Sequence, residues 1–304
     1  MSRVVVCGSL NMDIVVQSER RPSSGETLLG AEVTFLPGGK GLNQAVAAAR
    51  LGVPTAMIGA VGNDAFGNRL RGFLADNDVD SSGVREVEGP ATGVAVIQVA
   101  EGDNAITVAS GANMHFTRDM VRHAPRPDEV WVAQFEVPIP ESEAILEQAR
   151  AAGARTVLNL APYATHSDSL LQQVDVAVLN EVELSQASGM KIRSRSSQRT
   201  IAAACETLRA RGARAVVATL GARGAVVVTS NGTTAIPAAP AQVIDTTGAG
   251  DCFVGALAAR MAKGATPLEA ARYAVVAATC SVERLGASPA MPTAEDVAGR
   301  LPKA

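Results

Sequence analysis

Short apolar runs alternate with longer amphipathic stretches along most of the 304-residue chain. The runs are continuous in hydrophobicity, which is typical of strands buried on both faces of a parallel sheet, and they cover residues 4–7, 56–60, 130–133, 156–160, 174–179 and 215–219. Alanine-rich segments with helical spacing lie between them, at residues 41–51, 66–77, 141–152 and 198–211. This alternation predicts an α/β fold in which helices sandwich a mainly parallel central sheet.

Two regions break the alternation, at about residues 11–37 and 89–112. The second contains two strand-like runs, 92–100 and 104–109, around a turn formed by residues 101–104. Neither region has a helical pattern of its own. We predict a small β-sheet lid, inserted into one α/β domain that spans residues 1–304. The alternative is that the two regions are ordinary surface hairpins.

Composition narrows the classes of function. Hydrophobic residues make up 47% of the chain but aromatic residues only 3%, and the net charge is −3. Few rings and no basic stripe argue against partners such as nucleic acid or an anionic membrane. No signal peptide or membrane span is visible, so we expect a cytoplasmic protein. Its cysteines have no metal-ligand spacing and are expected to be buried free thiols, at Cys7, Cys205, Cys252 and Cys280.

Polar residues follow the first predicted strand, where ligands of open parallel sheets bind. Asn11 and Asp13 are two apart, so on an extended segment their side chains point the same way. An amide beside a carboxylate suits a polyhydroxylated ligand. Asn and Asp are also common in turns, which leaves a structural role open.

A glycine-rich segment precedes the helix predicted from residue 41. Gly38 and Gly39 stand before Lys40, and Gly41 follows it, so a ligand could approach the backbone and the free N–H groups of the helix start. The segment is not a phosphate-binding P-loop, because position 34 is Thr and no Ser or Thr follows the lysine. A strand-to-helix turn with a solvent-facing lysine is the alternative.

The sharpest pattern is Asp-Thr-Thr-Gly-Ala-Gly-Asp at residues 245–251, followed by an apolar helix over 252–262. Free N–H groups of residues 248–250 at the helix start would favour an anion. Asp251 beside them suits a general base that deprotonates a hydroxyl while the N–H groups hold a phosphoryl group. A carboxylate that only complements the helix dipole is the alternative.

Other chemistries fit the sequence less well. Phe253 replaces the third glycine of a dinucleotide fingerprint. The histidines His115, His123 and His166 neighbour no Ser or Cys motif, which disfavours a hydrolase triad. Cys252 is expected to be a packed thiol rather than a nucleophile.

Taken together, these motifs resemble the ribokinase-like (PfkB) carbohydrate kinases over nearly the whole chain. The resemblance rests on G-S-L-N-M-D at 8–13, P-G-G-K-G-L-N-Q-A at 37–45, T-G-V-A-V-I at 92–97, G-A-N at 111–113, N-L-A-P at 159–162, N-E-V-E at 180–183, T-L-G-A-R-G at 219–224 and D-T-T-G-A-G-D at 245–251. It implies a Rossmann-like three-layer fold with a β lid, and ATP-dependent phosphorylation of D-ribose at its 5-hydroxyl. Alternatives are another sugar or a nucleoside as substrate, or a sugar-binding protein without catalysis.

The resemblance also implies roles for individual residues. Asp251 would be the general base, beside an anion hole formed by Gly248, Ala249 and Gly250. The sugar would be held by Asn11, Asp13, Gly39, Lys40, Asn43, Glu136 and Asp251. Asn180 and Glu183 would help to place Mg²⁺ and the phosphates. The ATP would lie along Thr219, Gly221, Arg223 and Gly224.

A bound K⁺ and a homodimer formed through the lid are further implications of the resemblance. Backbone carbonyls would hold the K⁺, from Asp245, Thr247, Ser281, Arg284 and Gly286. Ribokinase-like enzymes often place a serine four residues after the glycine that matches Gly286, and here that position is Ala290. One ligand of the ion would then be lost, or replaced by Ser288 or water.

Overall fold

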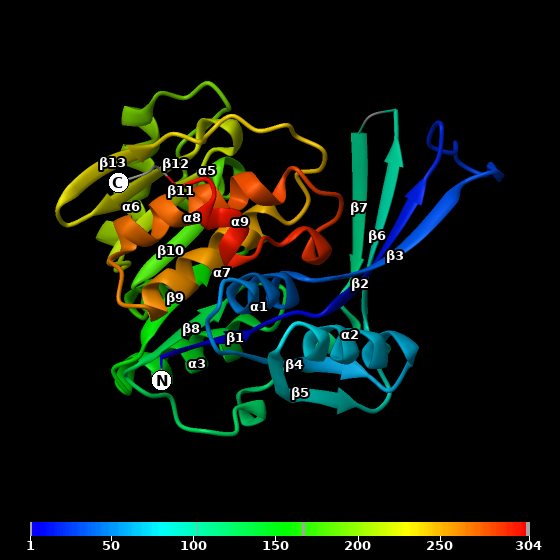
Figure 1. Cartoon of the computed structure of the whole chain (residues 1–304), viewed down its shortest axis with the longest axis horizontal. Coiled ribbons are helices and arrows are strands. Elements are labelled where there is room, and N and C mark those ends of the chain that lie inside the picture. Colours follow the sequence, from blue (N-terminus) through cyan, green and yellow to red (C-terminus); the bar gives the residue numbers. More distant parts are fainter. Residues whose placement is uncertain (1, 102, 166–167, 302–304) are drawn as a thin grey trace.

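A nine-stranded sheet forms the body of the protein in the computed structural model, which describes residues 2–101, 103–165 and 168–301 (Figure 1). In spatial order its strands are β13 (Gly232–Ile236), β12 (Ala225–Thr229), β11 (Ala215–Thr219), β10 (Val176–Asn180), β9 (Arg155–Asn159), β8 (Glu129–Ala133), β1 (Arg3–Cys7), β4 (Thr55–Gly62) and β5 (Val79–Val87). The strands from β11 to β5 pair in parallel, and the β12–β13 hairpin is antiparallel. The prediction of a mainly parallel sheet is confirmed.

Helices cover both faces of this sheet. One face packs against α1 (Lys40–Arg50), α2 (Ala65–Asp76), α7 (Ala249–Ala262), α8 (Pro267–Ser281) and α9 (Ala294–Ala298). The other packs against α3 (Ile139–Ala151), α4 (Asp168–Gln172), α5 (Glu181–Ser188) and α6 (Gln198–Ala210). Short 3₁₀ turns complete the chain, at η1 (Gly111–His115), η2 (Arg118–Met120), η3 (Gly221–Arg223) and η4 (Ser288–Ala290).

The strands contribute side chains to two separate cores, because successive side chains point to opposite faces of the sheet. Val4 and Val6 of β1 join the core beneath α1 and α7, whereas Val5 and Cys7 join the core beneath α3 and α6. Each predicted strand is thus buried on both sides, which explains why its sequence is continuously apolar. The four cysteines are free and buried, as expected.

A second sheet stands away from the body as a lid (Figure 1). It contains β3 (Glu32–Gly38), β2 (Asn11–Gln17), β6 (Gly93–Ala100) and β7 (Asp103–Ala109), in that spatial order. β2 and β6 pair in parallel, and the outer pairs are antiparallel. These strands lie within the two regions predicted to form the lid. Two residues named in the sequence analysis, Gly102 and His166, lie outside the described residues.

Close contact between α1 and α7 brings the starts of these helices together. Gly255 faces α1, and a Cβ built at this position would lie 2.5 Å from the carbonyl oxygen of Gln44. Only a glycine tolerates so near an approach of another backbone. The contact lies one turn after Asp251 and therefore sets the spacing of the site described below.

None of the helices in the described residues is long and apolar enough to cross a membrane.

Candidate active site

The predicted site residues come from elements that end or begin at the same edge of the sheet. β1, β8, β9, β10 and β11 point their carboxyl ends there, and α1 and α7 begin there. The chain first adds β4 and β5 on one side of β1 and then adds β8 to β11 on the other side. Such a reversal opens a crevice beyond the strand ends, where ligands of open α/β sheets bind.

Asp251 lies in the first turn of α7 and is only 7% exposed. Its Oδ2 accepts a hydrogen bond from Nδ2 of Asn43 (2.9 Å), and its Oδ1 accepts one from Nε2 of Gln44 (3.0 Å). Both donors belong to α1. Each oxygen of this buried carboxyl group is therefore held by one amide donor.

Further amides extend this contact into the sheet. Gln44 Nε2 also donates to Asn159 Oδ1 (3.1 Å), and Asn159 Nδ2 donates to the carbonyl oxygen of Val178 (3.1 Å). Gln134 Nε2 donates to Gln44 Oε1 (2.7 Å). Asp251 is therefore tied through side-chain amides to the carboxyl ends of β8, β9 and β10.

The glycine-rich segment wraps around the end of β1. Gly39 has a φ of 89°, and a Cβ there would lie 2.7 Å from the backbone nitrogen of Asn11. The turn lets the Lys40 N–H donate to Glu136 Oε2 (3.2 Å), which also accepts from Ser9 Oγ (2.5 Å). Glu136 thus meets the start of α1 although 96 residues separate it from Lys40.

Asn11 and Asp13 lie at the start of the lid strand β2, where it follows the end of β1. Both are buried, and Asn11 Oδ1 accepts from Asn113 Nδ2 (2.8 Å). Burial, together with the negative charges of Glu136 and Asp251, raises the pKa of Asp13 to about 7. Such a carboxyl group gains from ligand hydroxyls that replace the lost water.

Lys40 is the cation among these acidic groups. Burial lowers the pKa of its amine, but the negative charges of Asp251, Glu136 and Glu183 outweigh that effect and hold the pKa above its ordinary value. Lys40 therefore carries a positive charge in the crevice rather than in bulk solvent. Its predicted alternative, a solvent-facing lysine in a plain turn, is disfavoured by this burial.

At the start of α7, two of the three backbone N–H groups predicted to bind an anion are free among the described residues, and the third is already hydrogen-bonded. The N–H of Ala249 donates to the carbonyl oxygen of Thr246 (3.2 Å). The N–H groups of Gly248 and Gly250 have no acceptor in the described part of the chain. Two of the three predicted donors are thus free to bind an anion beside Asp251.

Asn180 and Glu183, predicted near Mg²⁺ and the phosphates, form the capping box of α5. Glu183 N–H donates to Asn180 Oδ1 (2.9 Å), and Asn180 N–H donates to Glu183 Oε2 (2.8 Å). Burial raises the pKa of Glu183 despite the opposing effects of the Asn180 N–H and Lys40. The pair lies at the carboxyl end of β10, on the same edge as Asp251.

The four residues predicted to lie along ATP follow the neighbouring strand β11, in a segment from Thr219 to Gly224. Thr219 Oγ1 lies 3.4 Å from the carbonyl oxygen of Leu179, which keeps it beside β10. Gly221 begins the turn η3. The Arg223 guanidinium pairs with Glu181 at 2.7 Å, so this side chain is engaged at the start of α5.

The residues predicted to hold K⁺ lie on two segments that are bonded together. Asp245 Oδ1 accepts from the Thr247 N–H (2.9 Å), and Asp245 Oδ2 accepts from the Gly286 N–H (2.9 Å). Burial raises the pKa of Asp245, but these hydrogen bonds outweigh it and lower the pKa overall. The Ser281 carbonyl accepts from the Arg284 N–H (3.2 Å) within the second segment.

Several buried polar residues near this site were not among the predicted ones. They are Ser9, Gln44, Asn113, Gln134 and Asn159. Ser288 is also buried there and was predicted only as an alternative ligand of K⁺. Ser288 Oγ donates to Asn43 Oδ1, which fixes the other end of the amide that contacts Asp251. Most of them stand inside or beside the motifs that carried the resemblance, and that position was the only signal in the sequence.

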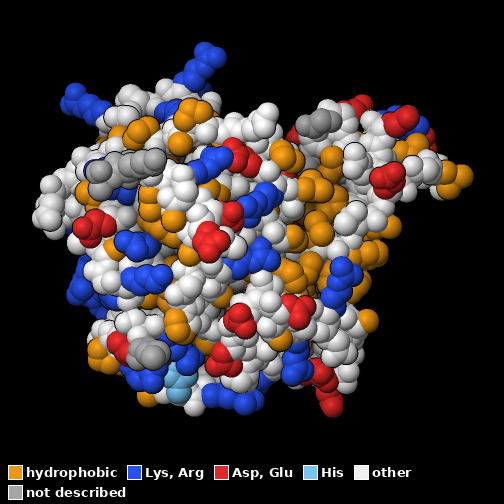
Figure 2. Space-filling view, in the orientation of Figure 1, with side chains coloured by type: hydrophobic (Ala, Val, Ile, Leu, Met, Phe, Trp, Pro, Cys, Tyr) orange, Lys and Arg blue, Asp and Glu red, His pale blue; other side chains and the backbone are white. Residues whose placement is uncertain are grey.

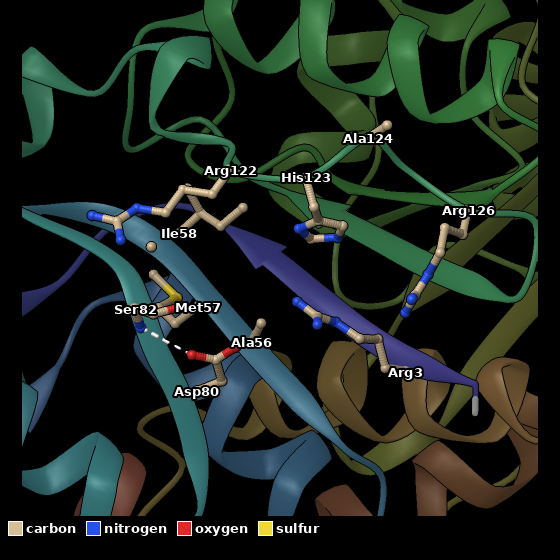
Figure 3. A pocket seen from close by; sticks show the side chains of 11 residues that line it. Arg3, Ala56, Met57, Ile58, Asp80, Ser82, Arg122, His123, Ala124 and Arg126 are labelled. Atoms are coloured by element: carbon tan, nitrogen blue, oxygen red, sulfur yellow. Dashed lines mark hydrogen bonds between the residues drawn. The ribbon is translucent and has the colours of Figure 1, made fainter.

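A separate cavity of about 280 Å³ lies at the opposite, amino end of β1 (Figure 3). Arg3, Arg122, His123 and Arg126 line it together with Asp80. Within this lining, Arg126 and Arg3 pair with the fully buried Glu129 at 3.1 Å and 3.6 Å, and Arg126 also pairs with Asp128 at 3.7 Å. The cavity contains no predicted site residue.

Comparisons with known proteins agree with this site. The pattern of the pfkB family carbohydrate kinases matches residues 1–294. Ribokinase of Haemophilus influenzae is 34% identical over 96% of both chains, and ribokinase of Staphylococcus aureus is 36% identical over 97% of this chain and 98% of that one. The solved structure of Arabidopsis thaliana ribokinase complexed with ribose and ATP superposes with a TM-score of 0.89 at 33% identity, over 98% of both chains.

These matches extend over nearly the whole chain and include both the body and the lid. The site motifs, from residue 8 to residue 251, all fall within the residues 1–294 that match the family. The chain is a sugar kinase and belongs to the pfkB family of carbohydrate kinases.

Proposed function

We propose that this protein transfers the γ-phosphoryl group of ATP to the 5-hydroxyl of D-ribose, with ribose 5-phosphate and ADP as products. One observation carries the proposal: a buried carboxylate, Asp251, is held by amides directly beside free backbone N–H groups at the start of α7. A proton acceptor next to an anion site is what phosphoryl transfer to an alcohol requires. The ribokinases of similar sequence support ribose as the substrate.

The sugar would bind between the lid and the body. Asp13 and Glu136 offer acceptors to its hydroxyl groups, and Asn11, Lys40 and Asn43 offer donors. Gly38 lets the Asp13 carboxyl group lie against the backbone, where a Cβ at position 38 would be 2.1 Å from Asp13 Oδ2. A pocket built to bond hydroxyls rejects analogues that lack them, because its buried polar atoms would be left unpaired.

The chemical step would use few groups. Asp251 takes the proton of the 5-hydroxyl as its oxygen attacks phosphorus, and the bond to the ADP oxygen breaks. The N–H groups of Gly248 and Gly250, the free ones at the α7 start, stabilise the negative charge of the phosphoryl oxygens. Ala249 contributes only if its N–H turns away from Thr246. Closure of the lid excludes water, which limits wasteful hydrolysis of ATP.

We propose that ATP lies along Thr219, Gly221, Arg223 and Gly224, with Mg²⁺ near Asn180 and Glu183. A carboxylate with a partner amide is the oxygen-rich donor set that Mg²⁺ binds, often through waters. Mg²⁺ would neutralise phosphate charge. Glu183 would orient the waters of the ion, and Arg223 would approach the nucleotide from the start of α5.

A K⁺ ion fits the paired segments that contain Asp245, Thr247, Ser281, Arg284 and Gly286. The Asp245 carboxylate is occupied by N–H donors of both segments, so backbone carbonyl oxygens, rather than this carboxylate, would hold the cation. The charge of K⁺ would favour the anion site at the start of α7. Ser288 Oγ donates its hydrogen to Asn43 Oδ1, which leaves the lone pairs of this oxygen available as a replacement for the serine that is Ala290 here.

We also propose that two copies associate through their lids in the cytoplasm. The lid leaves large apolar side chains exposed: Val33 55%, Phe35 37%, Val96 41%, Ile106 54% and Val108 46%. Figure 2 shows hydrophobic side chains gathered on the lid and where it meets the body. Exposed apolar patches of this kind mark protein interfaces.

The test is ADP release from ATP and Mg²⁺ with D-ribose, D-fructose, adenosine or no acceptor, each with and without K⁺. Ribose-dependent release that K⁺ increases is the expected result. Turnover of fructose or adenosine instead would move the specificity to another sugar or a nucleoside. Ribose binding by calorimetry without ADP release would make the protein a non-catalytic sugar binder.

The variant Asp251→Asn keeps the shape of the side chain and loses its capacity to accept a proton. We expect kcat with ribose to fall roughly 10²–10⁴-fold, the usual contribution of a general base, while the protein still binds ribose. Near-normal turnover would remove Asp251 from this role.

A further inference from the structure

The orientation of the Gln44 side chain is fixed by a main-chain carbonyl in the sheet. The Val178 carbonyl only accepts hydrogen bonds, so Asn159 must turn its Nδ2 towards it. The Oδ1 of Asn159 then points to Gln44 and can only accept, so Gln44 donates to it through its Nε2 (3.1 Å). The same Nε2 donates to Asp251 Oδ1 (3.0 Å). Because the Val178 carbonyl on β10 fixes the orientation of Asn159, and Asn159 fixes that of Gln44, the group that Gln44 turns towards Asp251 is a donor and not an acceptor.

Gln44 has no freedom to leave this arrangement. Its side chain is fully buried, and its Oε1 accepts from Gln134 Nε2 at 2.7 Å. Both hydrogens of its Nε2 and its oxygen are therefore engaged. A buried amide with all its partners satisfied is rigid, because turning it over would leave several polar atoms unpaired.

The two oxygens of Asp251 consequently face different neighbours. Oδ1 faces the rigid Gln44, which lies below the crevice and touches no proposed ligand. Oδ2 faces Asn43, a proposed sugar-binding residue that can exchange its bond to Asp251 for one to a sugar hydroxyl. Oδ2 is therefore the oxygen whose partner is a proposed sugar-binding residue.

We infer that Gln44 is a positioning residue, which holds Asp251 Oδ1 and so directs Oδ2 to the sugar hydroxyl as the proton acceptor. The inference rests on the proposed function, because it assigns the acting oxygen of the proposed base. Gln44 touches neither substrate in this arrangement, so its loss should lower kcat and leave both KM values nearly unchanged. A misplacement of about 1 Å in a catalytic group lowers the rate on the order of 10²-fold.

The chain offers matched variants for the test. Gln44→Met keeps the length and volume of the side chain but removes the donor to Asp251. Gln134→Met removes a buried amide from the same cluster, and that amide does not touch Asp251. Asn159→Leu leaves Gln44 in place but releases it from the orientation imposed by the sheet.

We would measure kcat, both KM values and the pH profile of kcat for each variant, after confirming its fold by circular dichroism. Gln44→Met should lower kcat roughly 10- to 100-fold. The acid limb of its profile should move to higher pH, since the carboxylate loses a donor that stabilises its charged form. Gln134→Met should move the acid limb less than Gln44→Met does, because the donor from Gln44 to Asp251 remains. Asn159→Leu should give a kcat and an acid limb between those of Gln44→Met and the natural protein. The double variant Gln44→Met/Asn159→Leu should be no slower than Gln44→Met.

Equal losses in Gln44→Met and Gln134→Met with an unmoved pH profile would overturn the inference and leave Gln44 as a packing residue. Additive effects in the double variant would overturn it as well. If Gln44→Met does not fold, the profile of Asn159→Leu decides in its place. An active Asp251→Asn would instead refute the proposed base, which keeps the two failures distinct.

Discussion

Three carboxyl groups and one ammonium group meet in the crevice, on Asp13, Glu136, Asp251 and Lys40. Lys40 compensates part of the negative charge, but Asp13 is buried beside two other acidic groups. A group of this kind lowers the stability of the empty protein and is retained for what it binds. The cost falls on the unliganded state, where no sugar hydroxyl is present.

The pH dependence of stability should reveal this cost. The pKa of Asp13 is about 7 in the folded protein and 3.8 in its ordinary state, so the folded form binds the proton more tightly. The free energy of unfolding therefore falls as pH rises from about 4 to 7 and then levels off. Asp13→Asn removes this effect and should gain on the order of 2–4 kcal/mol over the natural protein at pH 8, and less at pH 5.

Urea denaturation of both proteins at pH 5 and pH 8, without ligand, measures this difference. The same variant should raise the KM for ribose, because it loses an acceptor for sugar hydroxyls. A stabilisation of equal size at the two pH values would contradict the assigned titration of Asp13.

The sequence predicted Asn43 and Asp251 as neighbours only through the motifs in which they stand. Their contact joins residues 208 positions apart, which no periodicity can indicate. Gln44 stands in the same motif but was not predicted, because its role depends on Gln134 and Asn159 on separate strands. Residues that bind through a motif were thus predictable, and residues that act through a neighbour were not.

Elements were predicted best where burial is uniform. All six strands predicted for the central sheet exist; residues 215–219 match β11 at both ends, and the other five have boundaries shifted by one or two residues. β5 was not predicted, because it is an edge strand with a bulge opposite Met57, and the polar residues Asp80 to Ser82 interrupt its pattern. α8 was not predicted because it is apolar around most of its circumference and shows little periodicity.

The helices α5 and α8 both begin with a capping box. A comparison of the two therefore separates the proposed role of Asn180 in nucleotide binding from its role as a helix cap. Asn180 with Glu183 caps α5, and Thr266 with Glu269 caps α8 in the same way. Asn180→Ala and Thr266→Ala should each lose about 1 kcal/mol of stability. Only Asn180→Ala should also raise the KM for ATP with Mg²⁺.

Thermal unfolding and initial rates of the two variants make this comparison. If both change the KM for ATP to the same extent, the effect comes from helix stability. Asn180 would then have no part in placing Mg²⁺ or the phosphates.

At the scale of the whole molecule, the lid contains apolar side chains on both faces. By strand register Val108 pairs with Ala95 and Ala95 with Asp13, so Val108 lies on the face that carries Asp13. Val96 lies on the opposite face with Ile14 and Phe35. The body alone therefore leaves part of the lid uncovered, which is the basis of the proposed dimer.

The association state tests that proposal. The chain has a mass of 31.1 kDa, so light scattering should give about twice that value for the natural protein. Ile106→Glu places a charge on the edge strand β7, at a residue 54% exposed, and should return the mass to that of one chain. Val243→Glu, at a residue 62% exposed on the body, is the matched control and should stay dimeric. A natural protein of monomer mass would refute the dimer.

Gly255 binds nothing and lies outside every motif that carried the resemblance, yet it fixes how closely α7 can approach α1. Even the single methyl group of alanine would need space now occupied by the Gln44 carbonyl oxygen, 2.5 Å away. The two helices would have to part, and the amides of α1 would retreat from Asp251. An inherited or engineered Gly255→Ala change would pass for a conservative one in a survey of variants. Such a change would be harmful because it separates two closely packed helices, and a list of residues that contact ligands would not reveal it.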